Sequence, residues 1–208
     1  MTAIAPASDR IADYLAADAV IDHGHPLVRA AAEGLPGGDP TAVARAAYLL
    51  VRDTVGHSRD VDRWSAASAA SEVLAHGDAV CHGKSHLLAA LLRARRIPAG
   101  LCYQRLGDGA PGRFVLHALI AVRLDGRWSR LDARGNRPGI DAGFSLDAER
   151  LAFTADPAAD ERDYPLIHAA PPPGLLAALA LARPGVPGFD YLPDHLPDHL
   201  PDHLPDVL

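Results

Sequence analysis

The sequence is short of cysteine and lysine. Its 208 residues include two cysteines, Cys81 and Cys102, and a single lysine, Lys84. Two separated cysteines cannot form the disulfide framework of a small secreted domain or a four-cysteine zinc site. We therefore expect free thiols in a protein of a reducing, cytoplasmic compartment.

A strong charge of one sign and a long apolar run are also missing. The net charge of −6 is mildly acidic, so nothing favours nucleic acid or an anionic membrane as a partner. The apolar run "GLLAALALA" is far shorter than the roughly 20 residues that span a bilayer. The N-terminus lacks the basic segment and apolar core of a secretion signal. We expect neither a nucleic-acid partner nor a membrane partner.

The length and the turn residues predict one domain followed by a tail. Residues 1–190 are long enough for a single well-buried domain. Residues 191–208 repeat "PDHL", and proline every four residues forbids both helix and central strand. We expect a flexible, polyproline-like extension there. Its Asp-His pairs could bind a metal weakly, and a repeat without function is the default.

Helices are predicted in the first half and strands after them. Three-and-four spacing of apolar residues indicates helices over residues 25–35, 39–55, 65–77 and 81–96, the last ended by Pro98. The period then changes, and segments 99–106, 113–124 and 127–133 read as strands. Asp125-Gly126 between the last two is a strong hairpin signal. Helices followed by a compact antiparallel sheet predict an α+β domain.

Cys81 stands where a predicted helix begins. Its thiol would face the unpaired N–H groups and the positive end of the helix dipole, which favour the thiolate. The thiolate is the nucleophilic form of cysteine, so the placement suits covalent catalysis. Cys102, in an apolar strand, is expected in the core.

The predicted hairpin brings a histidine and an aspartate together. A two-residue loop at Asp125-Gly126 places His117 and Asp132 on one face as diagonal neighbours, roughly 7–8 Å apart at the backbone. That distance allows an Asp–His hydrogen bond. With Cys81 beside them, they would form a nucleophile, a base and an orienting carboxylate. The Cys81 backbone N–H is one expected oxyanion donor.

These blocks resemble the transglutaminase-like superfamily. "GDAVCHGKSHLLAALLRARRIPAG" followed by "HALIAVRLDGRWSRLDARGN" is similar to the core of that group, over about residues 40–155. The resemblance implies a papain-like α+β fold, with N-terminal helices, the nucleophile at a helix N-terminus and an antiparallel sheet. It also implies catalytic roles for Cys81, His117 and Asp132.

The expected activity is acyl transfer from an amide or peptide carbonyl through a thioester on Cys81. Water as acceptor would make the protein a peptidase or amidase, and an amine would make it an acyltransferase or transglutaminase. We expect no organic cofactor and no metal. The second oxyanion donor stays open among Gln104, Trp64 and Tyr103, and His57 is a further unassigned polar residue near the cleft.

Two alternatives come from other classes. The domain could be a binding or scaffold module that keeps the fold without turnover. It could also be a zinc enzyme, because His82 and His86 are four residues apart on one helix, as in helical zinc sites. The glutamate of an "HExxH" motif is missing, and Lys84 stands between the two histidines. Lys84 itself is expected to be solvated or to stabilise a thiolate at Cys81.

Overall fold

The computed structural model describes residues 3–196, which form a mixed helix-and-sheet fold with an antiparallel central sheet. The predicted α+β class is confirmed. The helices are α1 (Pro26–Glu33), α2 (Pro40–Thr54), α3 (Ser58–Val61), α4 (Ala70–His76), α5 (Cys81–Ala94) and α6 (Pro173–Leu179), with 3-10 turns at Ile11–Leu15 and Pro157–Ala159. The strands are β1 (Ala5–Pro6), β2 (Gly56–His57), β3 (Asp78–Ala79), β4 (Ala99–Gly107), β5 (Phe114–Leu124), β6 (Arg127–Leu131), β7 (Arg162–Asp163) and β8 (Leu166–Ile167).

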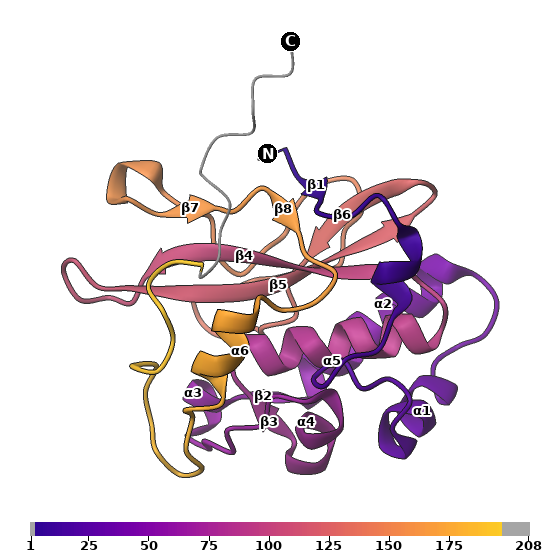
Figure 1. Cartoon of the computed structure of the whole chain (residues 1–208), viewed down its shortest axis with the longest axis horizontal. Helices are drawn as coiled ribbons and strands as arrows, with labels where there is room; N and C mark the ends of the chain where they lie inside the picture. Colours follow the sequence, from indigo (N-terminus) through magenta and orange to yellow (C-terminus); the bar gives the residue numbers. More distant parts are fainter. Residues whose placement is uncertain (1–2, 197–208) are drawn as a thin grey trace.

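The central sheet has the strand order β6-β5-β4-β7, and its neighbouring strands are antiparallel. It crosses the middle of the molecule with α5 along one face and α1 and α4 beyond α5 (Figure 1). β1 pairs with β8 on the other side of the sheet (Figure 1). The helix that begins at Cys81 therefore lies inside the molecule, between the sheet and the other helices.

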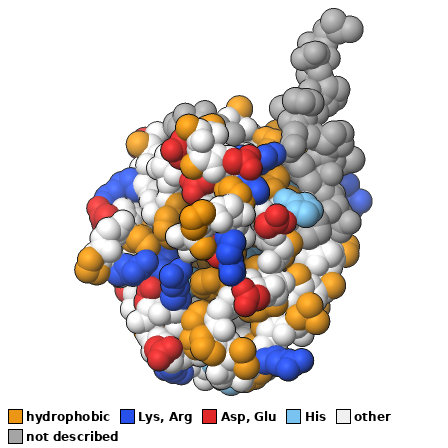
Figure 2. Space-filling model, turned by 90° about the vertical axis from the view of Figure 1, so that its left-hand side faces the viewer, with side chains coloured by type: hydrophobic (Ala, Val, Ile, Leu, Met, Phe, Trp, Pro, Cys, Tyr) orange, Lys and Arg blue, Asp and Glu red, His pale blue; other side chains and the backbone are white. Residues whose placement is uncertain are grey.

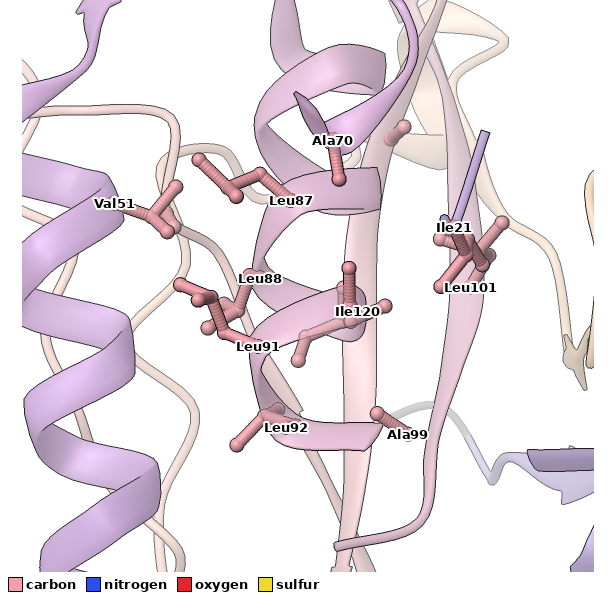
Figure 3. Packing of buried hydrophobic residues seen from close by; sticks show 14 of the residues in the cluster. Ile21, Val51, Ala70, Leu87, Leu88, Leu91, Leu92, Ala99, Leu101 and Ile120 are labelled. Carbon is pink, nitrogen blue, oxygen red and sulfur yellow. The ribbon is translucent and has the colours of Figure 1, made fainter. Parts of the chain in front are cut away.

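The main core forms around α5. Its apolar stripe was predicted from the spacing of four leucines, and Leu87, Leu88, Leu91 and Leu92 are all fully buried. Figure 3 shows these side chains between α5 and Val51 of α2. Full burial of one leucine stabilises a fold by about 1.5–3 kcal/mol. The stripe holds α5, and thus Cys81, in a fixed position.

A side-chain cap begins α2, a glycine ends α4, and α4 begins later than predicted. The Asp39 side chain accepts hydrogen bonds from the N–H groups of Thr41 and Ala42 and so caps α2. Gly77 ends α4 with a φ of 73°, the left-handed geometry that glycine adopts readily. The helix expected over 65–77 begins only at Ala70. Ser65 instead bonds Asp78, which holds this segment as a loop.

The burial and the hydrogen-bond partners of Lys84 differ from those predicted from the sequence. It is buried, not solvated, and its ammonium donates to the carbonyls of Val51 and Val55 rather than to a thiolate. Burial lowers the pKa of Lys84 to about 8. Those carbonyls lie at the C-terminal end of α2, where a helix cannot satisfy its own acceptors. Lys84 thus ties α5 to the end of α2.

Most of the predicted tail lies outside the described residues. Residues 197–208 hold most of the "PDHL" repeats, and the expected flexible extension and its weak metal binding fall there. Within the described part, Leu192 and Leu196 are buried in the main core, and the Leu196 N–H donates to the Tyr164 hydroxyl at 2.9 Å. The domain boundary at residue 190 stays a prediction. No helix among residues 3–196 has the length and apolar character needed to cross a membrane.

Gly83 gives a stability prediction for the part of α5 that carries Cys81. A Cβ at this position would lie 2.7 Å from the Ala67 carbonyl oxygen and 2.8 Å from the Ala79 Cβ. Overpacking of this kind costs about 1–3 kcal/mol, which exceeds the roughly 1 kcal/mol that alanine gains over glycine in a helix. We expect Gly83→Ala to lower the free energy of unfolding in urea. Gly34→Ala is the control, because its Cβ would meet nothing closer than 3.4 Å. Equal stability of the two variants would contradict the tight packing at Gly83.

Candidate active site

Cys81 is the first residue of α5, as the sequence predicted. The first N–H groups of a helix lack intrahelical partners, and the preceding residue, Val80, offers no side-chain cap. The thiol is buried, at 7% exposure. Pairing between β5 and β6 begins only at Ile120 opposite Leu131, and just before it the Ala118 N–H donates to the Cys81 Sγ at 3.5 Å. The thiol therefore sits at the end of the helix and against the edge of β5.

The hairpin has the predicted register. Leu124 pairs with Arg127 across a two-residue loop, in which Asp125 and Gly126 both have positive φ angles of 48° and 78°. His117 Nε2 lies 2.8 Å from Asp132 Oδ2, and both side chains are buried. The expected Asp–His hydrogen bond is confirmed.

Backbone groups hold the Asp132 carboxylate in place. Its Oδ1 accepts from the Arg134 N–H and its Oδ2 from the Ala152 N–H, each at 3.0 Å. Phe153 packs its ring edge-on against the His117 ring, with centroids 5.1 Å apart. The imidazole is thus fixed by one hydrogen bond and one aromatic contact. Because Asp132 occupies Nε2, Nδ1 is the nitrogen of His117 that is left to face the thiol, and Cys81 and His117 line one cavity.

The thiol and the imidazole shift each other's protonation. Burial alone would raise the pKa of the Cys81 thiol, but the charges of His82 and His117 and hydrogen bonds from His117 and His57 lower it well below its ordinary value. Burial would lower the pKa of His117, but the charges of Asp132 and Cys81 raise it. The opposite shifts favour a thiolate–imidazolium pair. Burial raises the pKa of the second thiol, Cys102, to about 12, as suits a core cysteine.

A cavity of about 350 Å³ gives access to this pair. Cys81 and His117 line it together with apolar side chains from distant parts of the chain, among them Leu106, Phe153 and Phe189. Its walls come from the β4–β5 turn, α3 and the segment after α6, which lie at the left of Figure 1.

Three arginines also line the cavity: Arg59, Arg134 and Arg137. Asp60 forms ion pairs with Arg134 and with Arg137, at 2.5 and 3.4 Å. Figure 2 faces this side of the molecule and shows basic and acidic side chains among hydrophobic ones. Asp108 and Glu161 line the cavity as well, so it combines an apolar surface with charged groups of both signs.

The three candidates for the second oxyanion donor do not line this cavity: Gln104, Trp64 and Tyr103. Gln104 lies opposite His117 in the sheet, but its amide donates to Asp163 at 2.8 Å. Tyr103 is fully buried, and Trp64 lines a separate pocket. His57, left unassigned from the sequence, does line the cavity. Phe153 and Phe189 were missed, because they lie in irregular segments without a periodic pattern.

The two histidines considered as zinc ligands are both fully buried in α5. His82 places Nδ1 3.5 Å from the Cys81 Sγ, and His86 Nδ1 lies 2.9 Å from the Ser68 carbonyl oxygen. Within residues 3–196, no three or more His, Cys, Asp or Glu side chains are grouped so that they could hold a metal ion. In the part of the chain that the structure describes, these histidines therefore have no further metal ligands beside them.

Residues 29–133 match the model of the transglutaminase-like superfamily, a range of just over half the chain that includes Cys81, His117 and Asp132. Two solved structures match part of the chain. A candidate cysteine protease from Cytophaga hutchinsonii is 19% identical with a TM-score of 0.48, and the match covers 64% of this chain and 46% of that one. A TGase is 22% identical with a TM-score of 0.41, and the match covers 62% and 35%. The match thus spans less than half the length of either protein. No curated protein sequence matches the chain.

Proposed function

The chain belongs to the transglutaminase-like superfamily, and on that premise we propose that it is a thiol-dependent acyl-transfer enzyme of the cysteine peptidase or amidase class. The observation that carries the proposal is the arrangement of Cys81, His117 and Asp132. The thiol and the imidazole line one cavity and shift each other's pKa, and the carboxylate bonds the imidazole at 2.8 Å. Nucleophile, base and orienting group in this order are what acyl transfer requires.

In the proposed reaction, the Cys81 thiolate attacks the carbonyl carbon of an amide. The electron pair of the C=O bond moves to oxygen and then returns to expel the amine, which takes the proton held by His117. The acyl group remains on Cys81 as a thioester. Neutral His117 then takes a proton from water or an amine as that nucleophile attacks the thioester. The Cys81 sulfur leaves as a thiolate, and the proton stays on the His117 imidazolium.

Asp132 keeps the His117 Nε2–H bonded and stabilises the imidazolium that forms in each half of the reaction. The Cys81 N–H at the start of α5 is the first donor to the oxyanion. We propose hydrolysis and amine transfer as the two outcomes of the same thioester. The free thiols, Cys81 and Cys102, suit a cytoplasmic location, which we retain as part of the proposal.

The cavity supports a substrate of peptide or amide type. Its volume suits a few residues, and its lining combines apolar side chains with arginines and acidic side chains. Short acylated peptides with apolar side chains match that lining. We propose such peptides as the substrate class to screen first.

Trapping the thioester tests the proposal. The protein is incubated with a panel of short N-acyl peptide amides, with neutral and acidic members matched in length, then quenched in acid and weighed by mass spectrometry. We expect an added acyl mass that maps to Cys81 and is absent from Cys81→Ala. Substrate conversion that continues unchanged in Cys81→Ala would contradict the proposal.

A further inference from the structure

The proposed acyl transfer needs a second hydrogen-bond donor beside the reacting carbonyl. Attack by the thiolate puts a negative charge on the carbonyl oxygen, and one backbone N–H at Cys81 provides only part of its stabilisation. Removing one donor of such a pair typically lowers kcat by about 10²–10³-fold. The residues first considered for this role do not line the cavity.

His57 is held beside the nucleophile by the backbone. It lies in the short strand β2, which pairs in parallel with β3, so that His57 lies opposite Ala79, two residues before Cys81. The neighbouring Gly56 N–H donates to the Gly77 carbonyl at 3.0 Å. Two segments 22 residues apart in sequence thus lie side by side just before the start of α5.

The His57 side chain lines the cavity, and one of its ring nitrogens is buried without a hydrogen-bond partner among the described residues. The residue is 93% buried, since only 7% of its surface is exposed, and it lines the same cavity as Cys81 and His117. Its ring packs against Phe189 with centroids 6.4 Å apart and is within hydrogen-bonding reach of the Cys81 sulfur. Its Nδ1 is buried and has no hydrogen-bond partner among the described residues. Buried polar atoms are nearly always satisfied, so an unused one beside a nucleophile points to a partner that arrives with the substrate.

The surroundings of His57 keep its imidazole neutral. Burial lowers the pKa of His57, against the raising effect of Cys81, and the charge of Arg134 lowers it further. Asp60, the acidic group that acts in the opposite direction, is engaged by Arg134 and Arg137. A neutral imidazole carries one N–H donor at pH 7. Among residues 3–196, His57 has no direct carboxylate partner such as Asp132 is for His117, so the two rings suit different tasks.

We propose that the neutral imidazole of His57 donates a hydrogen bond to the carbonyl oxygen as it becomes negative, and so completes the oxyanion site with the Cys81 N–H. This inference rests on the proposed function. In the resting enzyme the ring remains beside the sulfur. His117 moves the proton, and His57 stabilises charge without giving up its own.

Two probes separate this role from the reactivity of the thiol. A short N-acylated peptide aldehyde ending in leucinal adds to a thiolate and places its oxygen where the oxyanion forms. Iodoacetamide alkylates the same sulfur without forming an oxyanion. We expect His57→Leu to weaken aldehyde binding about 10²–10³-fold, while iodoacetamide labelling of Cys81 at pH 7 changes less than about 10-fold. His57→Gln, which keeps an N–H donor, restores most of the aldehyde affinity.

Equal aldehyde affinity in His57→Leu and the unaltered protein would overturn the role of His57 alone. Failure of the unaltered protein to react with either probe would overturn the proposed function, and the inference with it. Thermal unfolding checks that the variants are folded. If His57→Leu does not fold, His57→Met tests the same loss of a donor.

Discussion

Replacing Cys81 with serine lowers kcat by about 10⁴–10⁶-fold, the loss seen when a hydrolase loses its nucleophile. The site is arranged to ionise a thiol: the charges of His82 and His117 and the contacts of His117 and His57 lower its pKa. A hydroxyl is a far weaker acid than a thiol, so the same surroundings leave serine protonated. The substitution is nearly isosteric, and we expect the fold to remain. Turnover of an acyl peptide that reacts in the thioester experiment is the measurement.

Cys102→Ala is the matched control for this prediction. Cys102 is the other cysteine of the chain, and it is fully buried in the smaller apolar cluster of Tyr14 and Ile167. Burial raises the pKa of its thiol to about 12, so it is not ionised near neutral pH. We expect unchanged kcat in this variant. Retention of more than about a tenth of the activity by Cys81→Ser would show that the reaction does not pass through the Cys81 sulfur.

Exchanging Asp132 for asparagine has the next largest effect, a fall in kcat of about 10³–10⁴-fold, as in other triads that lose the carboxylate. Both carboxylate oxygens of Asp132 accept hydrogen bonds: Oδ1 from the Arg134 N–H, and Oδ2 from the Ala152 N–H and His117 Nε2. An amide has one acceptor oxygen and one donor NH₂. If its NH₂ faces His117, the ring must present a lone pair at Nε2 and carry its proton at Nδ1, where it can no longer take the thiol proton. If its oxygen faces His117, the NH₂ faces the Arg134 N–H, and two hydrogen-bond donors then oppose each other.

The direction of the pH shift expected in Asp132→Asn follows from the negative charge of Asp132. The charge of Asp132 raises the pKa of His117, so its loss lowers that pKa and the imidazolium deprotonates at lower pH. The thiolate then loses its positive partner, and the pKa of Cys81 rises. We expect thiol reactivity to shift to higher pH. Asp141→Asn is the control, because Asp141 is an exposed carboxylate that pairs with Arg150. Equal pH profiles in the two variants would contradict the role of Asp132.

The sequence predicts the His117–Asp132 pair because short-range signals define it. Asp125-Gly126 determines a two-residue loop, and the alternation of side chains along strands then places His117 and Asp132 on one face. The position of Cys81 follows in the same way from the apolar stripe of the helix that it opens. Each of these signals spans fewer than twenty residues and has a defined period.

The rest of the cavity has no such signal. β2 and β3 are two residues long, too short for a period-2 pattern, and their pairing is what brings His57 to Cys81. Phe153 and Phe189 reach the cavity from irregular segments, which are positioned by long-range packing. Lys84 was expected in solvent because its burial depends on the open carbonyls of another helix. Such contacts depend on the folded chain and leave no periodic trace in the sequence.

The central claim, a thiolate at Cys81 stabilised by His117, is tested most directly by the pH dependence of iodoacetamide labelling, read at each cysteine by mass spectrometry. Cys102 is the internal control, and His117→Ala is the comparison. The account predicts that Cys81 labels rapidly well below the free thiol value of about pH 8.5 and that Cys102 does not. In His117→Ala, labelling of Cys81 is expected to shift up to the pH range of a free thiol. Labelling of Cys81 that follows a free thiol, unchanged in His117→Ala, would contradict it.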